Sequence, residues 1–401
     1  MPPCKALSPA PSRGTTAFEP VKPPCSKHAA LRDPAPGLYV HVPFCAGKCA
    51  YCDFYSLPER TRIPAWIEAV QAEAHLFRGQ FPRFDTLYLG GGTPSLLGLR
   101  ELERLLQGLF RELAFSPSPE ITLEANPDDL SPGRLTAYLD VGIRRISLGI
   151  QALEDTTLRF LGRRHTAYRA EQALADILNA GFSSVSVDLI YGIPGQTSRA
   201  WEKTLQRVLC FRPHHISCYQ LTLSPKTPLG KQHRAGRIHL PEEDTLADLF
   251  LATSEILRDR GYLHYEVSNF ALPGHTSRHN RKYWRRAPYL GLGPAAHSFL
   301  APVRWWNPSS LDTYIRQISS GRSPAEGSEV LSREQALLET LGLGFRTAEG
   351  VPGRVLSACA DGNQTVQDLE QQGLVARQGT RVVPTCRGMM IADRLPLLFL
   401  P

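Results

Sequence analysis

The chain has 401 residues, of which 42% are hydrophobic and 21% charged. This ordinary globular usage predicts two or three domains and excludes a chain that is disordered throughout. No stretch approaches the about 18 uninterrupted apolar residues of a membrane-spanning helix. The 45 Lys and Arg residues exceed the 38 Asp and Glu residues and give a net charge of +7, an excess that fits an anionic small ligand as well as nucleic acid.

Residues 1–36 carry nine prolines and no periodic apolar pattern, so they predict a disordered, Pro-rich leader. The leader lacks the apolar core of a signal peptide and the arginine-rich amphipathic pattern of a mitochondrial presequence, so we expect a cytoplasmic protein. The chain has nine cysteines, an odd number, and three of them lie close together. Such a cluster indicates a metal or redox site in a reducing compartment rather than a disulfide framework.

From residue 38 onward, short β-branched runs alternate with longer helical patterns. The runs are 38–42, 86–89, 121–124, 145–150, 185–190 and 216–221. The helical patterns between them include 63–79, 96–113, 168–180 and 198–210. Strands separated by helices predict parallel βαβ units over residues 37–225, folded as an open barrel or a wound sheet. Ligands lie at the carboxyl ends of the strands in either fold, and polar or glycine-rich motifs follow these runs.

Two further regions follow the predicted barrel. Residues 226–324 hold a helical pattern at 243–260 and then an aromatic, basic stretch. Residues 325–401 hold a helical pattern at 333–344, then the pattern of a helix, a two-stranded wing with Gly379 at its turn, and a last helix. This order predicts a small winged-helix-like unit. Its basic residues are sparse and form no recognition-helix stripe, so we expect no specific nucleic-acid partner.

A cysteine motif follows the first predicted strand. Cys45, Cys49 and Cys52 have the spacing C-x3-C-x2-C. Three thiolates on one loop can bind three irons of a tetranuclear iron–sulfur cluster and leave the fourth iron open to an exchangeable ligand. The alternative is a zinc site, or thiols that bind nothing. Zinc sites usually pair two cysteine arms, and the sequence has no second arm.

This spacing after the first strand of a βα series resembles the radical S-adenosylmethionine (SAM) superfamily. Several motifs are similar to its oxygen-independent coproporphyrinogen III oxidase branch over residues 38–395: Tyr-x-His-x-Pro-Phe-Cys, Tyr-Cys-x-Phe, Gly-Gly-Gly-Thr-Pro-Ser, Ser-Leu-Gly-Ile-Gln and Asp-Leu-Ile-Tyr-Gly-Ile-Pro-Gly-Gln-Thr. The resemblance implies an α/β fold, a partial (βα)6 radical SAM barrel followed by a C-terminal α+β region. It also implies that Cys45, Cys49 and Cys52 bind a [4Fe-4S] cluster, whose open iron takes the amino and carboxylate groups of SAM.

The same resemblance implies a set of SAM contacts. Two tyrosines would flank the cofactor, the backbone of a glycine turn would meet its methionine end, and four polar side chains would complete the site. These residues are Tyr39 and Tyr51, then Gly91, Gly92 and Thr93, and then Glu124, Gln151, Arg163 and Asp188. Glycine lets a backbone approach a ligand closely, carboxylates suit ribose hydroxyls, and a guanidinium suits a carboxylate.

One position separates two groups within this branch. Phe54 lies two residues after the third cysteine, where the oxidases carry a fourth cysteine, and the leader does not resemble the N-terminal extension of the oxidases. Both departures are similar to the HemW group, which is regarded as haem chaperones that deliver haem to respiratory enzymes. An oxygen-independent coproporphyrinogen III oxidase of porphyrin biosynthesis is the alternative, so the sequence leaves open whether the chain is an enzyme.

A second motif, His-Asn-x-x-Tyr-Trp, resembles the haem-binding signature of the HemW group. It implies haem contacts at His279, Asn280, Tyr283 and Trp284. Imidazole can bind the iron axially, aromatic rings can stack on the macrocycle, and arginines can pair with propionates. Five cations within residues 278–286 repel one another, which predicts an anionic ligand. The resemblance also allows a homodimer and a peripheral contact with a membrane partner.

Overall fold

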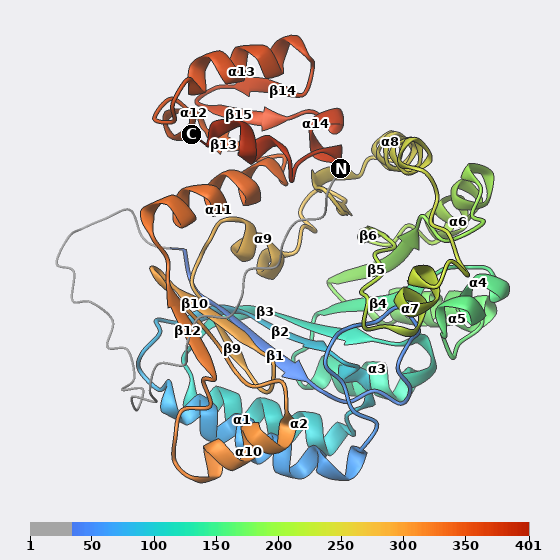
Figure 1. Ribbon diagram of the computed structural model, residues 1–401. Coiled ribbons are helices and arrows are strands. Elements are labelled where there is room, and N and C mark those ends of the chain that lie inside the picture. Colours follow the sequence, from blue (N-terminus) through green and yellow to red (C-terminus); the bar gives the residue numbers. More distant parts are fainter. Residues whose placement is uncertain (1–33, 401) are drawn as a thin grey trace.

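The computed structural model describes residues 34–400 (Figure 1). The predicted disordered leader, with Cys4 and Cys25, lies almost entirely outside the described residues. Within them the chain forms one large mixed sheet, a set of helices on its convex face, and a small C-terminal unit with a sheet of its own. The α/β fold class is therefore confirmed.

Six parallel strands in sequential order form the centre of the large sheet. They are β1 (Gly37–Val42), β2 (Phe84–Gly91), β3 (Phe115–Ala125), β4 (Arg145–Gln151), β5 (Ser184–Tyr191) and β6 (His215–Gln220). Each contains most or all of one predicted run. Both faces of these strands are covered, as along β5, where Val185 and Val187 on one face have no exposed surface and Ser186 on the other face is 2% exposed. The sequence located the strands because each is a short run with β-branched residues between helical patterns.

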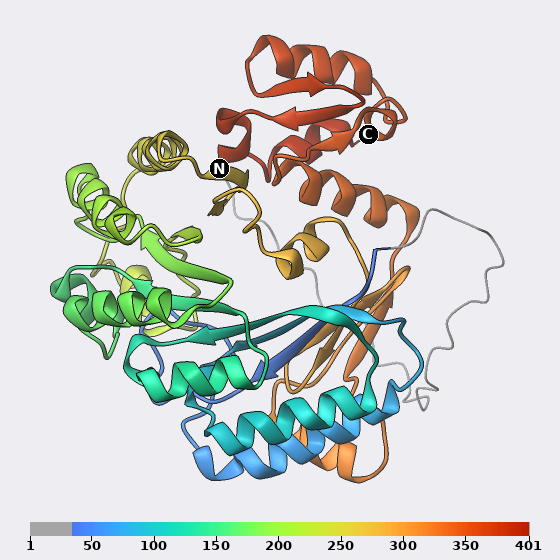
Figure 2. The same ribbon diagram turned by 180° about the vertical axis from the view of Figure 1, so that it is seen from behind.

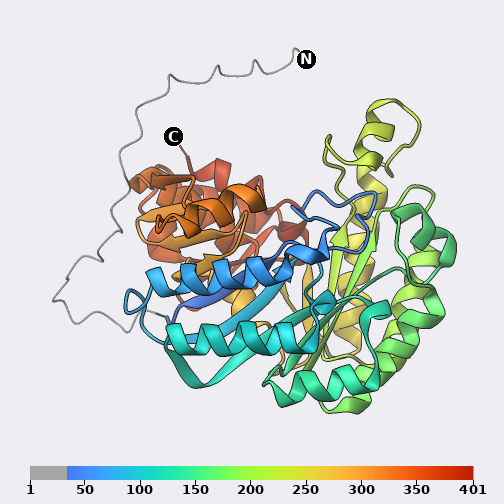
Figure 3. The same cartoon turned by 90° about the horizontal axis from the view of Figure 1, so that it is seen from below.

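Helices connect these strands on the convex face. They are α1 (Ile63–Leu76), α2 (Leu99–Glu112), α3 (Pro132–Asp140), α4 (Asp155–Leu161), α5 (Ala167–Ala180) and α6 (Ser198–Phe211). Seen from below, α1 and α2 lie side by side across the strands (Figure 3). Local signals fix the helix ends: Thr166 and Thr197 accept hydrogen bonds from backbone N–H groups of the first turns of α5 and α6, and Gly181 ends α5 at φ +93°. The predicted partial barrel is confirmed.

The region 226–324 extends both edges of the same sheet. Two strands, β7 (Leu263–Glu266) and β8 (Asn269–Ala271), continue from β6; three more, β9 (Tyr289–Leu292), β10 (His297–Leu300) and β11 (Val303–Trp306), continue from β1. A further strand, β12 (Gly327–Val330), follows this region in the chain and pairs with β11. The helices of the region are α7 (Pro228–Arg234), α8 (Glu243–Asp259), α9 (Arg278–Trp284) and α10 (Leu311–Ser319). Figures 1 and 2 show α9 on the concave side of the sheet, opposite α1, α2 and α10. The region therefore shares the sheet and the core of the barrel, and a domain boundary at residue 225 stays a prediction.

The C-terminal unit follows β12, which belongs to the large sheet, and the domain boundary at residue 325 stays a prediction. It contains α11 (Arg333–Phe345), β13 (Val351–Pro352), α12 (Gly353–Leu356), α13 (Gly362–Gln371), β14 (Val375–Gln378), β15 (Arg381–Pro384) and α14 (Cys386–Met390). It has its own apolar core. Gly379 turns between β14 and β15 at φ +56°, so the wing has the predicted form. Short 3-10 helices complete the chain at Arg60–Arg62, Pro94–Leu96, Pro127–Asp129 and Leu395–Phe399.

A search of the described helices finds none with the length and apolar character that crossing a bilayer requires.

Candidate cofactor site

The three cysteines of the motif lie on the loop 43–57, which follows the carboxyl end of β1. Backbone hydrogen bonds hold this loop at several points. The N–H of Cys45 donates to the carbonyl of Leu57 at 2.9 Å, and the N–H of Ala50 donates to the carbonyl of Leu161 at 3.0 Å. All three cysteines are free thiols and partly exposed. The loop is therefore anchored by its backbone, and its thiols remain available to a ligand.

The thiols face a cavity of about 460 Å³ at the carboxyl ends of the barrel strands. We call it the cysteine cavity. Every predicted SAM contact except Tyr39 lines it: Tyr51, Gly91, Gly92, Thr93, Glu124, Gln151, Arg163 and Asp188. The structure thus brings together residues from the first five strands and the loops that follow them, as expected for a ligand site in a parallel α/β fold.

The glycine turn after β2 is required by close packing against β1. Gly91 has φ +104°, and a Cβ atom there would lie 2.5 Å from Nδ1 of His41. A Cβ atom on Gly92 would lie 2.7 Å from the carbonyl oxygen of Val42. Any larger residue would push the turn away from the first strand, and therefore away from the cysteine loop.

The N–H groups of this turn are already occupied within the protein. That of Gly91 donates to Oε2 of Glu124 at 3.1 Å. Those of Gly92 and Thr93 donate to carbonyl oxygens of the first strand and its loop, both at 2.8 Å. These N–H groups are therefore not free to bind a ligand, which leaves the carbonyl oxygens of the turn, and carbonyl oxygens suit an ammonium group.

Two half-buried carboxyl groups lie on the floor of the cavity. Glu124 accepts a hydrogen bond from the hydroxyl of Tyr88 at 2.8 Å, and Asp188 accepts one from the hydroxyl of Ser147 at 3.0 Å. Burial raises the pKa of Glu124 to about 7, and it also raises the pKa of Asp188. Hydrogen bonds from the hydroxyl groups of a ligand would stabilise these desolvated carboxylates, so this floor fits a polyhydroxylated ligand.

Arg163 connects the cavity to the thiols. Its Nη1 donates to Sγ of Cys49 at 3.4 Å, and its Nη2 donates to the carbonyl of Gly149 at 2.7 Å. Its Nε is buried and has no hydrogen-bond partner among the described residues. A ligand carboxylate bound beside this thiol would gain a charge-assisted hydrogen bond from the unpaired N–H of Arg163.

Two features of the cavity needed the structure to be recognised. Asn126 hydrogen-bonds Oγ1 of Thr93 at 3.3 Å and accepts a hydrogen bond from Arg163. Its signal in the sequence was its place directly after β3, beside Glu124. Gln151 has φ +68°, a left-handed conformation that costs free energy for a non-glycine residue and is concentrated at functional sites.

The donor set fits an iron–sulfur cluster. Three thiols on one loop face one cavity, and the side chain two positions after the last of them is Phe54, which is 64% exposed. In residues 34–400 no three His, Cys, Asp or Glu side chains are grouped as a single metal ion would require. A cubane does not require such grouping, because each thiolate binds a different iron.

Tyr39 lies outside the cysteine cavity, contrary to expectation. It lines a second hollow of about 470 Å³ on the other side of the segment 53–55. We call this the tyrosine hollow; it is lined by Tyr39, His41, Asp53, Phe54, Tyr55, Tyr283, Tyr289, Ala295 and His297. Side chains two apart on a strand share a face, so Tyr39 and His41 point the same way, whereas the thiols come after the strand has ended.

His279, the predicted iron ligand, is closed off in this structure. Its side chain is buried on α9; its Nδ1 lies 2.9 Å from Oγ1 of Thr86, and its Nε2 lies 2.9 Å from the hydroxyl of Tyr283. Burial, aided by the nearby Lys282, lowers the pKa of His279 to about 3. The ring is thus neutral, and both of its nitrogens are occupied by protein groups.

Of the other three residues of that motif, Tyr283 lines the tyrosine hollow. Trp284 packs beneath the guanidinium of Arg346, 5.6 Å from the ring centroid, and Asn280 lies in the first turn of α9. Neither Asn280 nor Trp284 lines the cysteine cavity or the tyrosine hollow. The structure thus places one of the four predicted haem contacts, Tyr283, in the wall of a hollow.

Each of the five cations around α9 has a carboxylate partner. Asp85 forms ion pairs with Arg278 and Lys282, at 3.1 and 2.6 Å. The other three pair with carboxylates of α11 and the loop after it: Arg281 and Arg285 with Glu349, and Arg286 with Glu339. The basic stretch therefore fastens α9 to β2 and to the C-terminal unit, and an anionic ligand beside it stays a prediction.

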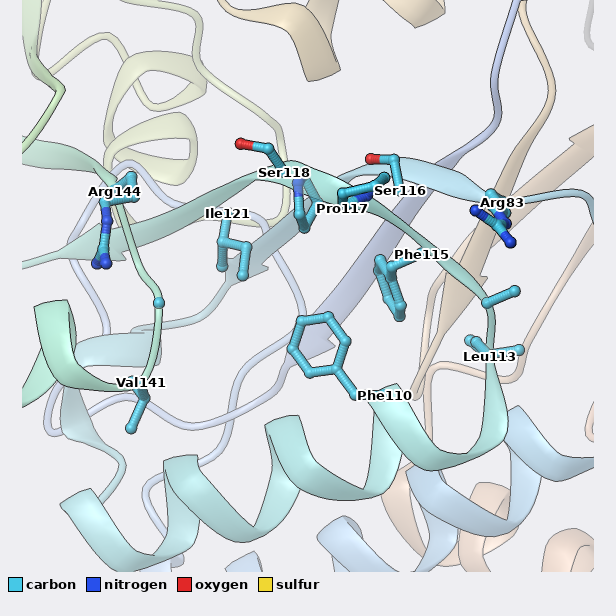
Figure 4. Close-up of a pocket in the computed structure, with 13 residues that line it drawn as sticks. Arg83, Phe110, Leu113, Phe115, Ser116, Pro117, Ser118, Ile121, Val141 and Arg144 are labelled. Atoms are coloured by element: carbon cyan, nitrogen blue, oxygen red, sulfur yellow. The ribbon is translucent and has the colours of Figure 1, made fainter.

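A further hollow of about 720 Å³ lies at the opposite end of the strands, between α2 and the start of β3 (Figure 4). Arg83 and Arg144 lie on its two sides, with Phe110 and Phe115 between them. No cysteine, histidine or carboxylate lines it, so it does not share the chemistry of the cysteine cavity.

Comparison with known proteins agrees with this geometry. Residues 39–208 match the Radical SAM superfamily, and residues 331–391 match the HemN C-terminal domain. The haem chaperone HemW of Synechocystis is 38% identical over 78% of this chain and 78% of its own length. The haem chaperone HemW of Mycobacterium tuberculosis is 33% identical over 89% of this chain and 93% of its own.

Two further proteins, one with a similar sequence and one with a similar structure, extend this comparison. The mitochondrial radical S-adenosyl methionine domain-containing protein 1 of Bos taurus is 32% identical over 94% of this chain and 91% of its own length. The solved coproporphyrinogen III oxidase of Escherichia coli has a TM-score of 0.77 at 23% identity, over 92% of this chain and 91% of its own. The oxidase therefore shares the fold.

The barrel, its cysteine loop and the superfamily match define a radical SAM protein, whose class binds a [4Fe-4S] cluster and SAM. Within that class the chain belongs to the HemW family, at 38% identity to one member over most of both chains.

Proposed function

We propose that this protein is a haem chaperone that binds a [4Fe-4S] cluster and SAM, binds haem, and transfers it to respiratory haem proteins. The observation that carries the proposal is the identity with named haem chaperones over most of both chains. Phe54 supports it, since the loop offers three thiols and then an exposed apolar ring. We propose the cytoplasm as its compartment, because adjacent free thiols require reducing conditions.

We assign the residues of the cysteine cavity as follows. Cys45, Cys49 and Cys52 hold the cluster, which supplies single electrons to the SAM bound at its open iron. Nε of Arg163 receives the carboxylate of SAM, and the carbonyl oxygens of the turn at 91–93 receive its ammonium group. Glu124 and Asp188 accept its ribose hydroxyls, and Tyr51 and Gln151 complete the walls.

An oxygen-independent coproporphyrinogen III oxidase is the second candidate, and the shared fold favours it. One anaerobic experiment separates the two. The reconstituted protein is given SAM, a reductant, and either coproporphyrinogen III or haem. We expect stoichiometric haem uptake and no decarboxylation. Formation of protoporphyrinogen IX would establish the oxidase instead, and a protein that takes up no haem would contradict the chaperone.

The haem acceptor is proposed only as a class, the respiratory haem proteins, reached through a peripheral contact at the membrane. A homodimer is proposed as well. Sedimentation of the reconstituted protein with and without haem tests it: a monomer in both states would contradict the dimer.

A further inference from the structure

The tyrosine hollow has the walls that a porphyrin face requires. Four tyrosines, at 39, 55, 283 and 289, line its sides, and the ring of Phe54 stands at its edge with 64% of its surface exposed. Tyr283 and Tyr289 pack edge to face at 4.8 Å between ring centroids. Aromatic rings provide large apolar contact areas, and a volume of about 470 Å³ is in the range of small-molecule sites.

Two histidines line the hollow, and they differ in what their rings contact. Nε2 of His41 lies 2.9 Å from the carbonyl of Tyr55, and its Nδ1 lies 3.2 Å from the hydroxyl of Tyr39. His41 is also only 4% exposed. Both of its nitrogens therefore have protein partners, so His41 forms part of the wall of the hollow and has no free nitrogen for a ligand.

His297 has the opposite character. It is the first residue of β10, it is exposed, and its ring stacks on Trp306 at 6.0 Å between centroids. Antiparallel pairing of β10 with β11 sets His297 opposite Trp306 and fixes its position. Its ring nitrogens make no hydrogen bond to the described part of the chain. A neutral imidazole that is held in place and has an open nitrogen is a suitable axial ligand for iron.

The motif on α9 then has a positioning role. His279 bonds Thr86 on β2 with one nitrogen and the hydroxyl of Tyr283 with the other. It therefore holds the Tyr283 ring in the wall of the hollow. Lys282 and its partner Asp85 keep α9 against the same strand.

We propose that the tyrosine hollow is the seat of the haem and that His297 is the axial ligand of its iron. This inference rests on the proposed chaperone function, because it requires that the protein bind haem. It places the haem beside the cysteine loop, across Asp53 and Phe54, which line both cavities.

The test is a titration of the cluster-loaded protein with ferric haem, followed by difference absorption and by the electron paramagnetic resonance of the haem iron. The variants are His297→Ala, His279→Ala, and His239→Ala as the matched control, since His239 is exposed and lies outside both cavities. We expect His297→Ala to weaken haem binding about tenfold or more and to shift the Soret band. Added imidazole should restore the wild-type spectrum of this variant only.

We expect His279→Ala to weaken binding but to keep the wild-type band position, and His239→Ala to match wild type. If wild type binds haem and His297→Ala matches it in affinity and spectrum, the inference is wrong while the chaperone function stands. The same holds if His279→Ala loses the band and His297→Ala keeps it. If wild type binds no haem, the proposed function itself fails.

Discussion

The cysteine loop and helix α9 carry the two densest motifs of the chain, and the fold treats them in opposite ways. The loop is held by its backbone, so its thiols point into a cavity and one buried nitrogen of Arg163 beside them stays unpaired. On α9, by contrast, His279 and all five cations have protein partners. Residues capable of binding a ligand form an open site where they face a cavity, as the thiols do, and not where protein groups enclose them, as they enclose His279.

The largest expected effect is on the thiols. Replacing Cys49 by Ala should abolish the [4Fe-4S] cluster and with it SAM binding, because, of the thiols in residues 34–400, only three face the cavity. The measurement is bound iron and the cluster absorbance after anaerobic reconstitution. Cys210→Ser is the matched control, since Cys210 is exposed on α6 away from the cavity. A Cys210→Ser protein that binds less iron than wild type would contradict the three-cysteine assignment.

The next effect concerns the turn that supports the loop. Gly91→Ala combines φ +104° with a Cβ atom 2.5 Å from His41, and we expect it to cost about 3 kcal/mol of unfolding free energy and to weaken SAM binding. Gly236→Ala is the control: its φ is +67° but nothing lies within 4 Å, so it should cost about 1 kcal/mol. Urea unfolding measures both. Equal losses would show that packing against β1 does not matter.

The ion pairs of α9 should matter for stability rather than for ligand binding. Asp85→Ala leaves Lys282 without its carboxylate partner, and the Lys282 side chain is only 8% exposed. We expect a loss of about 2 kcal/mol in unfolding free energy. The control is Asp312→Ala, which removes the pair with Arg62 at a side chain that is 71% exposed and should cost less unfolding free energy than Asp85→Ala. A stable Asp85→Ala protein would mean that α9 is not fastened through this pair.

The smallest effect is a pH dependence. The folded pKa of His279, about 3, lies below the ordinary value of about 6.5. The contribution of neutral His279 to stability is therefore present above pH 6.5 and is lost as the pH falls toward 3. Between about pH 7.5 and pH 5, wild type should lose about 1–2 kcal/mol more than His279→Gln, measured by urea unfolding. Parallel losses would show that the ring is not buried in its neutral form.

The sequence located the central strands and the cysteine cavity for a physical reason. Short runs with β-branched residues between helical patterns mark the strands, and parallel strands bring the residues after their carboxyl ends to one edge. The extension of the sheet by β9 to β12 left no such trace. These strands have four residues each, too few to show a period. In addition, β9 pairs with β1 although the two strands lie far apart in the sequence.

The haem motif shows the second limit of the sequence. A list of residue types gives their chemistry but not their partners, and the partners of the α9 cations come from distant segments at Asp85, Glu339 and Glu349. A lone histidine such as the exposed His297 carries no pattern in the sequence that marks it as a ligand. Only the pairing of β10 with β11 brings it to the rim of the tyrosine hollow.

Asp53 and Phe54 line both the cysteine cavity and the tyrosine hollow, so the two sites share one wall. If bound SAM changes the affinity for a ligand in the hollow by some factor, that ligand must change the affinity for SAM by the same factor. Because the two residues border both sites, any change in their position on one side changes the wall of the other.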